Sequence, residues 1–498
     1  MADHFEIKKL GMVGAGSMGG GMSLLFAENG VAVSLNDPSE ETMDGLLKTA
    51  EEQGLGSKLS KHSSYDDLCK SLDSPKVFVF SLPHGSVGDS VLDGLHPYLE
   101  PGDIIIDASN ENWENTQRRQ GKSMQQGVYY IGMGVSGGYQ AARRGPSMCP
   151  GGTDDALKRV MPLLEKVAAK DENGTPCVGK AGEGGAGHYV KMVHNGIEHG
   201  MMSAISEAWQ IMTICLGMSY DEVGKEFERW NADGELKGTF LVSIGIQICQ
   251  QRDDHHKHVL AGIKDKVVQD IDGSEGTGIW TNEEAIRLHI PAPTLTTAHF
   301  IRIASADRAQ REHVQQTFEG HFPVSKINHC ESERSAFLED LRLAVYAACL
   351  ASYVQGINII DAADAENKWK IDLSTILQIW RAGCIIQADA IAGILTPIWT
   401  VHGRDRNRNL LYEHKIAEEL KKGFGPLKKV VFKGVEANAV IPSLSATLEY
   451  LKYSGNTILP TSFYEAELDY FGKHMFDLTS DAAGKPVTGK HHFEWKKA

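Results

Sequence analysis

A glycine-rich loop between an apolar run and a helix-like segment is the feature that most narrows the fold of this chain. Ile7–Val13 has the length and apolar character of a strand, and Gly14-Ala-Gly16-Ser-Met-Gly19 follows it directly. Glycines at this spacing allow a tight turn and let backbone N–H groups approach a pyrophosphate at the N-terminus of the next helix. A flexible glycine turn is the plain alternative, but a strand before the loop and a helix after it favour a dinucleotide site. The predicted cofactor-binding residues here are Gly14, Gly16, Ser17, Met18 and Gly19.

The next strand-like run carries a carboxylate at its end. Val31–Leu35 is followed by Asn36-Asp37-Pro38, and Asp37 lies eighteen residues after Gly19. A carboxylate at this place accepts hydrogen bonds from the ribose 2′-OH of NAD and repels the 2′-phosphate of NADP. Capping the following helix is a second, compatible role for Asp37. We therefore expect Asn36 and Asp37 to contact the cofactor, with NAD preferred and NADP as the alternative.

The pattern of short and long segments changes near residue 185. Before it, strand-sized runs at Val77–Leu82, Ile104–Asp107 and Tyr129–Met133 join the two already named, with the helix-like segments Met18–Glu28 and Ala156–Ala168 among them. This alternation is typical of a mostly parallel sheet covered by helices. Long helical patterns dominate after it, over residues 188–215, 219–230, 295–318, 333–364 and 403–422.

These patterns predict an α/β N-terminal Rossmann-type doubly wound domain, a large all-α domain and a C-terminal tail. The expected boundaries are residues 1–184, 185–455 and 456–498.

Composition excludes several classes of partner. The 498 residues hold 50 Lys and Arg against 65 Asp and Glu, a formal net charge of −15, which argues against nucleic acid or an anionic membrane as the main partner. The eight scattered cysteines indicate reduced, buried side chains. We find no signal-peptide pattern and no apolar stretch of membrane-spanning length, the nearest being Cys384–Trp399, so a cytoplasmic enzyme is the expectation.

One helical segment places several reactive side chains together. Lys191, His194, Asn195 and Glu198 are spaced i, i+3, i+4 and i+7, which puts them on one face of a helix. A solvated charged face is the common explanation of such spacing. The mixture of a base, an acid and two polar groups beside glycine-rich backbone instead favours catalysis, with Lys191 as general base and Glu198 as acid.

The same segment resembles the signature helix of the decarboxylating 6-phosphogluconate dehydrogenases, within the β-hydroxyacid dehydrogenase superfamily. Other matching motifs occur in order along nearly the whole chain: Asp107-Ala-Ser-Asn110, Gly134-Val-Ser136-Gly137-Gly138, Gly276-Thr277-Gly-Ile-Trp280, Trp380-Arg-Ala-Gly-Cys384 and Asp469-Tyr-Phe-Gly-Lys-His474.

The resemblance implies specific roles. Lys191 would take the C3 hydroxyl proton of a sugar acid as hydride leaves, and Glu198 would protonate the enediol that remains after loss of carbon dioxide, with no metal required. It also implies a homodimer whose tail brings His474 to the partner's site. Implied cofactor contacts include Leu82, Pro83 and Asn110. Implied substrate contacts are Asn110, Ser136, Gly137, Gly138, His194, Asn195, His199, Glu275, Thr277, Arg302 and His474.

The chain departs from the family pattern where relatives bind phosphates. On the cofactor side, the family's arginine is Asp37 and a family lysine is His84. In the substrate's phosphate pocket, a family lysine is Glu275, the tail arginine is Leu468, and the tyrosine after the catalytic glutamate is His199. Loss of cationic partners favours a substrate with no phosphate or a differently placed one. The alternative is that Arg302 or Lys473 takes the place of the missing cations and binds the phosphate.

Three readings of function follow from this sequence. The first is an oxidative decarboxylase that prefers NAD, with 6-phosphogluconate or an unphosphorylated aldonate as substrate. The second is a β-hydroxyacid dehydrogenase that releases an oxo acid without decarboxylation, and the third is a non-catalytic NAD-binding dimer. Carbon dioxide release and cofactor reduction separate the three.

Overall fold

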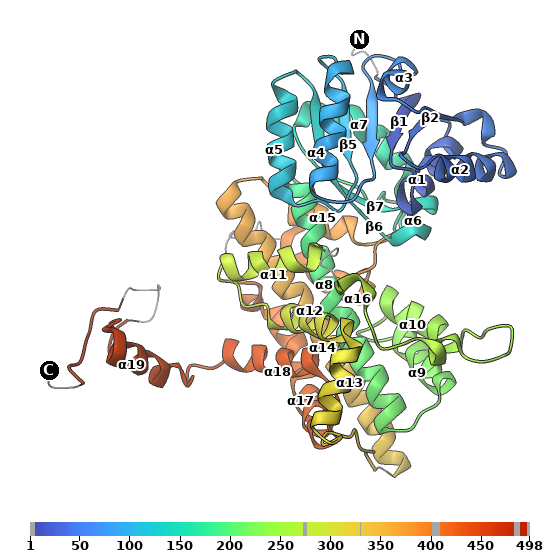
Figure 1. The fold of residues 1–498 in the computed structure, drawn as a ribbon. Coiled ribbons are helices and arrows are strands. Elements are labelled where there is room, and N and C mark those ends of the chain that lie inside the picture. Colours follow the sequence, from blue (N-terminus) through green and yellow to red (C-terminus); the bar gives the residue numbers. More distant parts are fainter. Residues whose placement is uncertain (1–4, 272–275, 329, 401–408, 483–488, 496–498) are drawn as a thin grey trace. The chain divides into compact units, whose positions relative to one another are not determined.

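The computed structural model describes residues 5–271, 276–328, 330–400, 409–482 and 489–495 (Figure 1). The chain forms two compact units, Met1–Leu448 and Glu449–Ala498. The first unit begins with a seven-stranded sheet of order β3-β2-β1-β4-β5-β6-β7. Its strands are β1 Lys9–Val13, β2 Ala32–Asn36, β3 Leu59–Lys61, β4 Val77–Phe80, β5 Ile104–Asp107, β6 Tyr129–Ser136 and β7 Ser147–Gly151.

Neighbouring strands are parallel except β7, which is antiparallel to β6. The strand order reverses between β1 and β4, which is the point where doubly wound sheets bind dinucleotides. The predicted Rossmann-type fold is confirmed.

The central strands are apolar on both faces because helices cover both. Val77 and Val79 belong to one hydrophobic cluster, whereas the alternate residues Phe78 and Phe80 belong to another. Successive side chains of a strand point to opposite faces, so a fully covered strand has a continuous apolar run rather than an alternating one. Helices α1 and α7 contribute to the first cluster and α3 and α4 to the second. The helices of this region are α1 Ser17–Glu28, α2 Glu40–Glu52, α3 Tyr65–Lys70, α4 Ser86–Leu95, α5 Trp113–Met124, α6 Gly138–Arg144 and α7 Asp154–Val167.

The rest of the first unit is helical, as predicted. The long helix α14 packs against both α8 and α17, and α8 also contacts β6 and β7 (Figure 1). Helix α8 therefore belongs to the helical core and to the sheet at once. The helices are α8 Ala186–Gln210, α9 Tyr220–Ala232, α10 Phe240–Gln250, α11 Thr277–Arg287, α12 Pro293–Ala306, α13 Arg308–Thr317, α14 Glu331–Asn367, α15 Leu373–Ile379, α16 Asp389–Thr400, α17 His414–Glu436 and α18 Pro442–Ser454.

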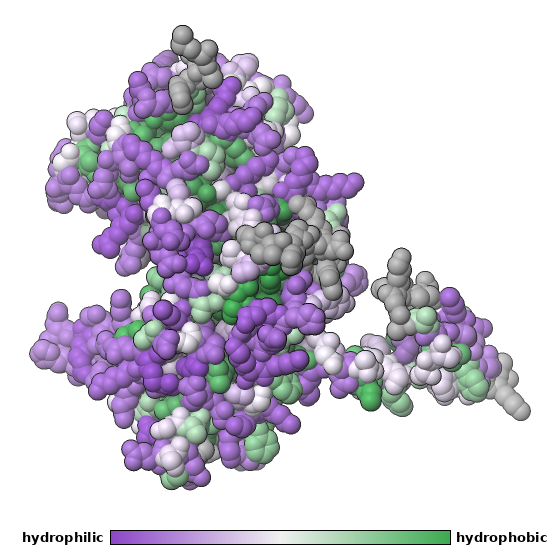
Figure 2. All heavy atoms as spheres, turned by 180° about the vertical axis from the view of Figure 1, so that it is seen from behind, coloured by the Kyte–Doolittle hydropathy of each residue, from purple (hydrophilic) through white to green (hydrophobic). Residues whose placement is uncertain are grey.

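The second unit contains α19, Thr461–Gly472, and an irregular segment after it. The side chain of Asp469 joins the two, because it accepts hydrogen bonds from the Trp495 indole, the His492 ring and the Phe493 backbone N–H. Hydrophobic side chains of this unit lie at the surface among hydrophilic ones (Figure 2), including Phe463, Tyr464 and Phe471.

The structure corrects several expected elements. Strands β3 and β7 were not predicted, because neither is a clear apolar run: their sequences are Leu-Ser-Lys and Ser-Met-Cys-Pro-Gly. The pattern over residues 295–318 is two helices, because Asp307 ends α12 and caps α13 by accepting from the Gln310 backbone N–H.

The pattern predicted over residues 403–422 is displaced. Residues 401–408 lie outside the described part of the chain, and α17 continues to Glu436 through Gly423 and Pro426. Gly423 is required by packing rather than by a turn, because a Cβ there would lie 2.6 Å from the Ala347 Cβ of α14.

Two expectations about burial also change. Cys330 is exposed, whereas the other seven cysteines are buried as expected. Among the described residues, α14 is apolar and long enough to cross a membrane by length and composition alone, yet 94% of its most apolar window is buried inside the protein. The helix is the core of the helical region, and its apolar character reflects contacts on all sides.

Glu207 anchors the start of α18 to α8. Its carboxylate accepts hydrogen bonds from the backbone N–H groups of Ser443 (2.8 Å) and Leu444 (2.9 Å) and from the Ser203 hydroxyl (2.8 Å). Burial raises the pKa of Glu207 to about 7 in spite of these bonds.

We predict that the stabilising effect of Glu207 decreases as pH rises. The native protein binds the carboxyl proton between the ordinary pKa of 4.5 and about 7, where the unfolded chain has lost it, so this contribution is present at low pH and lost through pH 7. The difference in free energy of unfolding between wild type and Glu207→Gln should fall by about 2–3 kcal/mol from pH 5 to pH 8. Urea unfolding of both proteins at each pH measures it, and a difference that does not change with pH would contradict the prediction.

Candidate active site

The glycine loop has the shape that a bound pyrophosphate requires. Gly14 has φ +94°, and a Cβ on it would lie 2.2 Å from the Ser81 carbonyl oxygen. A Cβ on Gly19 would lie 2.0 Å from the Gly14 carbonyl oxygen. Only glycine fits at either position, so β1, α1 and the segment after β4 approach each other with backbone alone. Gly16 caps α1 with no side-chain hydrogen bond, which leaves the first N–H groups of α1 facing the loop.

Asp37 lies directly against this loop. One carboxylate oxygen accepts a hydrogen bond from the Ala15 backbone N–H (2.7 Å) and the other from that of Ser39 (2.8 Å). The N-cap of α2 is Ser39, whose hydroxyl accepts from the Thr42 N–H, so Asp37 does not cap that helix. Asn36 is buried and bonds the glycine loop through its backbone, with its carbonyl accepting from Gly14 (2.9 Å). The negative charge of Asp37 is thus held at the end of β2, beside the loop.

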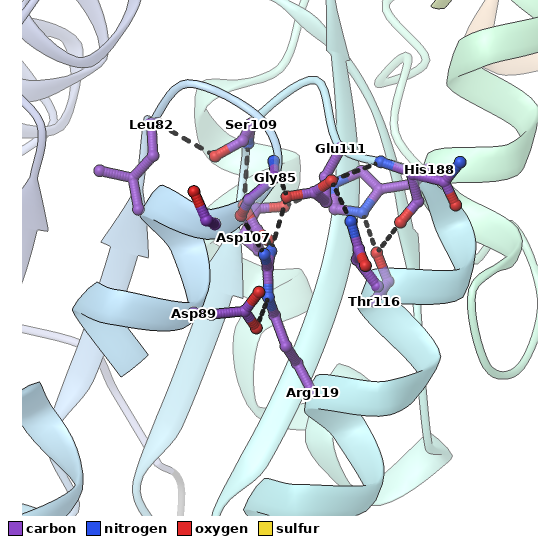
Figure 3. Close-up of polar contacts among 12 residues, drawn as sticks. Leu82, Gly85, Asp89, Asp107, Ser109, Glu111, Thr116, Arg119 and His188 are labelled. Atoms are coloured by element: carbon purple, nitrogen blue, oxygen red, sulfur yellow. Dashed lines mark hydrogen bonds and ion pairs between the residues drawn. The ribbon is translucent and has the colours of Figure 1, made fainter. Parts of the chain in front are cut away.

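The other predicted cofactor residues follow the ends of neighbouring strands. Leu82 and Pro83 follow β4, and Asn110 follows β5. The two segments are joined, because the Leu82 backbone N–H donates to the Ser109 hydroxyl (3.0 Å, Figure 3). His84 is stacked edge-on against Trp280 of α11, with ring centroids 5.2 Å apart. The loop after β4 therefore contacts the helical region as well.

Helix α8 brings Lys191 to the sheet by close backbone packing. A Cβ on Gly134 of β6 would lie 2.4 Å from the Lys191 Cβ and 2.5 Å from the Cys149 Sγ. Gly134 is therefore needed for α8 to lie on β6 at the depth that Lys191 occupies. Lys191 is only 7% exposed, although its side chain is cationic in water.

A continuous chain of hydrogen bonds holds the catalytic candidates. The Lys191 ammonium donates to the Asn195 side-chain oxygen (2.8 Å), and the Asn195 amide nitrogen donates to the Thr277 hydroxyl (2.9 Å). His194 Nδ1 lies 3.1 Å from the same Asn195 oxygen, and its Nε2 lies 2.9 Å from the Ser136 hydroxyl. Three residues of the predicted stripe, Lys191, His194 and Asn195, form one connected group with Ser136 and Thr277 that joins β6, α8 and α11.

His194 is neutral in this group. Burial is the main cause that holds the pKa of His194 well below its ordinary value, and the nearby Lys191 charge lowers it further. Because an amide oxygen only accepts, Nδ1 carries the ring proton and Nε2 accepts from Ser136. His194 thus orients Asn195 and Ser136 without adding a positive charge beside Lys191.

Glu198 and the distal residues extend the same face of α8. A Glu198 carboxylate oxygen lies 3.9 Å from His194 Nδ1, and its side chain is 20% exposed. The next residue, His199, contacts the Arg302 guanidinium through Nε2, and Arg302 also donates to Asp270 (2.8 Å). Burial, assisted by the charge of Arg302, holds the pKa of His199 well below its ordinary value.

The remaining predicted substrate residues fall in three places. Gly137 and Gly138 have positive φ (+108° and +70°) and begin α6 directly after Ser136, at the end of β6. Glu275 lies outside the described residues. His474 and Leu468 belong to the second compact unit. Within that unit, the His474 ring packs edge-on against Phe471.

Sequence reasoning missed a buried polar cluster that joins the end of β5 to α5 and α8. Asp107, Glu111, Thr116, Arg119 and His188 are all buried and connected by hydrogen bonds (Figure 3). The available signal was His188, which precedes Lys191 by three residues and so shares its helix face.

Comparisons with known proteins agree with this architecture. The family model for the NAD binding domain of 6-phosphogluconate dehydrogenase matches residues 9–181, and the model for the 6-phosphogluconate dehydrogenase C-terminal domain matches residues 187–495. The chain is 43% identical to the decarboxylating 6-phosphogluconate dehydrogenase of Emericella nidulans, over 97% of this chain and 100% of that protein. It is 35% identical to a chloroplastic decarboxylating enzyme of Spinacia oleracea, over 98% of this chain and 88% of that one.

A solved structure shows the same overall fold. Plasmodium falciparum 6-phosphogluconate dehydrogenase, studied in apo form, with NADP+ and with 6-phosphogluconate, superimposes with a TM-score of 0.86 at 31% identity. The match covers 98% of this chain and 100% of the other. From the two domain matches and these full-length similarities, the chain belongs to the 6-phosphogluconate dehydrogenase family.

Proposed function

We propose that this protein catalyses the NAD(P)-dependent oxidative decarboxylation of a β-hydroxy sugar acid, the family reaction being 6-phospho-D-gluconate to ribulose 5-phosphate and carbon dioxide. The observation that carries the proposal is the hydrogen-bonded chain of Ser136, His194, Asn195, Lys191 and Thr277 beside a dinucleotide-type sheet edge. The decarboxylating relatives support the same reaction.

The residues present fit a nicotinamide dinucleotide. The glycine loop leaves no room for side chains at Gly14 and Gly19, and the start of α1 offers backbone donors where a pyrophosphate would bind. Asp37 would face the adenosine ribose, and Leu82, Pro83 and Asn110 would line the cofactor further along the sheet edge. When bound, the nicotinamide supplies an acceptor for the hydride from C3.

The side chains of this protein would move the protons. Lys191 in its neutral form takes the C3 hydroxyl proton, so that C3 becomes a ketone as its hydrogen leaves as hydride. The resulting β-keto acid loses its carboxyl group as carbon dioxide, and the bond electrons form an enediol while Lys191 returns the proton to the C3 oxygen. Glu198 then donates a proton to C1 of the enediol, which was C2 of the acid before decarboxylation. Lys191 takes back the proton of the hydroxyl on the former C3, which leaves the ketose. Asn195 holds the Lys191 nitrogen throughout, which reduces the cost of orienting it.

We predict that Lys191→Met abolishes turnover but not cofactor binding. Loss of a general base costs about 10²–10⁴ in rate, and methionine keeps the length of the buried stem. Turnover is followed by cofactor reduction with carbon dioxide measured in parallel, and cofactor binding by titration of fluorescence. Lys428→Met is a matched control, because Lys428 is exposed on α17. Undiminished turnover in Lys191→Met would remove Lys191 as the base.

We also propose that the enzyme prefers NAD to NADP. The Asp37 carboxylate is held beside the glycine loop by two backbone hydrogen bonds, so its charge has a fixed place at the end of β2. A 2′-phosphate brought near this charge would be repelled, whereas a 2′-hydroxyl could donate to it.

The prediction is a higher kcat/KM with NAD than with NADP, by about tenfold or more. Asp37→Asn should narrow this ratio, because asparagine keeps an acceptor for the Ala15 N–H while removing the charge. Asp44→Asn is a control, since Asp44 is an exposed carboxylate on α2 that pairs with Lys61 instead. Steady-state kinetics with both cofactors measure the ratio, and a wild-type enzyme that uses NADP better would overturn the assignment.

We propose that the natural substrate is an unphosphorylated aldonate, or one with a differently placed phosphate. Arg302 is the matching cation of the phosphate pocket, and its guanidinium already binds Asp270 and His199. Glu275 and Leu468 stand where relatives have a lysine and an arginine. Two missing charge-assisted hydrogen bonds of about 1.5–3 kcal/mol each would weaken phosphate binding substantially.

We further propose a homodimer in which the C-terminal segment completes the partner's site. The resemblance to the family implies this arrangement, and the exposed Phe463, Tyr464 and Phe471 of α19 are of the type that dimer interfaces bury. His474 and Leu468 would then act on the partner's substrate.

The phosphate argument predicts the effect of restoring two cations. The double variant Glu275→Lys, Leu468→Arg should raise kcat/KM for 6-phosphogluconate relative to gluconate by about tenfold or more. Glu275→Gln is the control that removes charge without adding a cation, and it should give a smaller gain. Steady-state assays of wild type and variants on both substrates decide the point. No gain in the double variant would mean that other groups already bind the phosphate.

A further inference from the structure

A buried polar network connects the segments after β4 and β5 with helices α5 and α8 (Figure 3). Arg119 is 1% exposed, and its guanidinium donates to the Glu111 carboxylate (2.7 Å) and to the Gly85 carbonyl (2.7 Å). Glu111 in turn accepts from the Gly85 backbone N–H (3.0 Å). The network therefore ties the segment after β5 to the segment after β4.

His188 connects this network to the catalytic helix. Its Nε2 lies 3.0 Å from the Asp107 carbonyl oxygen and its Nδ1 2.6 Å from the Thr116 hydroxyl. Burial is the main cause that lowers the pKa of His188. Because a carbonyl only accepts, Nε2 carries the proton of the neutral ring and Nδ1 accepts from Thr116. Both ring nitrogens are thus used, and the ring orientation is fixed.

The hydrogen bond between His188 and Asp107 joins two residues that are each close in sequence to a residue of the candidate site. His188 lies three residues before Lys191 on α8, so the two side chains share one face of the helix. Asp107 is the last residue of β5 and lies three residues before Asn110. The hydrogen bond between them joins the Asn110 segment to the Lys191 helix.

A glycine of the sheet leaves room for the contact between His188 and Thr116. A Cβ on Gly132 of β6 would lie 2.5 Å from the Thr116 Cγ2 and 3.0 Å from His188 Nδ1. A second set of contacts connects Asp107 to the segment after β4 that carries Leu82. Ser109 donates its N–H to the Asp107 carboxylate (3.1 Å), and its hydroxyl accepts from the Leu82 N–H.

We propose that His188 is a positioning residue that sets the distance between the Lys191 helix and the loops carrying Asn110 and Leu82. The inference rests on the proposed function, because Lys191 and Asn110 would act on substrate and cofactor. Reacting atoms must lie within about 3–3.5 Å, and a misplacement of about 1 Å can lower a rate about a hundredfold. Loss of the His188 contact should therefore lower kcat more than it weakens binding.

Two substitutions of His188 test the hydrogen bonds of Nε2 and Nδ1 separately. Glutamine can place its amide nitrogen near the Nε2 position and donate to the Asp107 carbonyl, whereas asparagine reaches only the Nδ1 position and the Thr116 hydroxyl. His188→Asn should lower kcat about tenfold to a hundredfold with the cofactor Kd changed less than about threefold, and His188→Gln should recover to within about threefold of wild type. Thr116→Val, which keeps the shape but not the hydroxyl, should lower kcat several-fold.

The assay uses the full-length protein with NAD and, separately, with NADP, on 6-phosphogluconate and on gluconate, and compares each substrate with its C3-deuterated form. The isotope effect on kcat should increase in His188→Asn, because a misplaced hydride donor makes the chemical step slower. Val160→Ala is the control for stability alone, since Val160 is buried in α7, in the hydrophobic cluster that contains Val77 and Val79. It should lower the melting temperature without changing kcat or the isotope effect per active site.

The outcomes distinguish the two proposals. Wild-type kcat and isotope effect in folded His188→Asn would overturn the positioning role, whereas a wild type without turnover would overturn the proposed function instead. In that case hydrogen exchange of the amides in residues 108–111 and 188–191 tests His188 directly. Faster exchange in His188→Asn than in His188→Gln supports the role, and equal exchange in both variants and wild type refutes it.

Discussion

The close contact between helix α8 and strand β6 is the constraint on which the candidate site depends. A Cβ on Gly187 would lie 2.1 Å from the Gly132 carbonyl oxygen, and a Cβ on Gly134 would strike the side chain of Lys191. With backbone against backbone, the first turns of α8 become part of the sheet layer. Lys191 can then stand at the edge where dinucleotides bind, although α8 belongs to the helical core. An alanine at either glycine would force α8 away from β6, and this shift would disturb the packing of α8 on α11, α12 and α14.

Burial at this contact has an electrostatic consequence. His188, His194 and His199 lie along α8, and burial lowers the pKa of each. Neutral rings can serve as donor on one nitrogen and acceptor on the other, which suits them to orient neighbours such as Asn195. Three charged rings beside Lys191 would instead repel its ammonium and each other. The polar side chains of the helix are thus compatible with a buried lysine because most of them are uncharged.

The sequence predicted the parts of the fold that depend on local pattern. The strand–glycine–helix signal at Gly14 and the stripe from Lys191 to Glu198 are set by neighbours within a few residues, and both were found where expected. Strand β7 was missed because it is formed by antiparallel pairing with β6, a long-range contact that its own residues do not indicate. The Arg119 and Glu111 pair was missed for the same reason. Charged residues are read as exposed unless the fold reveals that they are buried together.

In the glycine loop, a single side chain links the shape of the loop to the proposed choice of cofactor. Asp37 accepts the Ala15 N–H, so its carboxylate both orders the loop and places a negative charge beside it. Relatives with an arginine at this position, as the resemblance implies, cannot order the loop through a carboxylate acceptor. A change of cofactor in such an enzyme would therefore alter the backbone of the loop together with its charge. The carboxylate is a structural acceptor for the loop, and the proposed discrimination against a 2′-phosphate would follow from the place that this acceptor occupies.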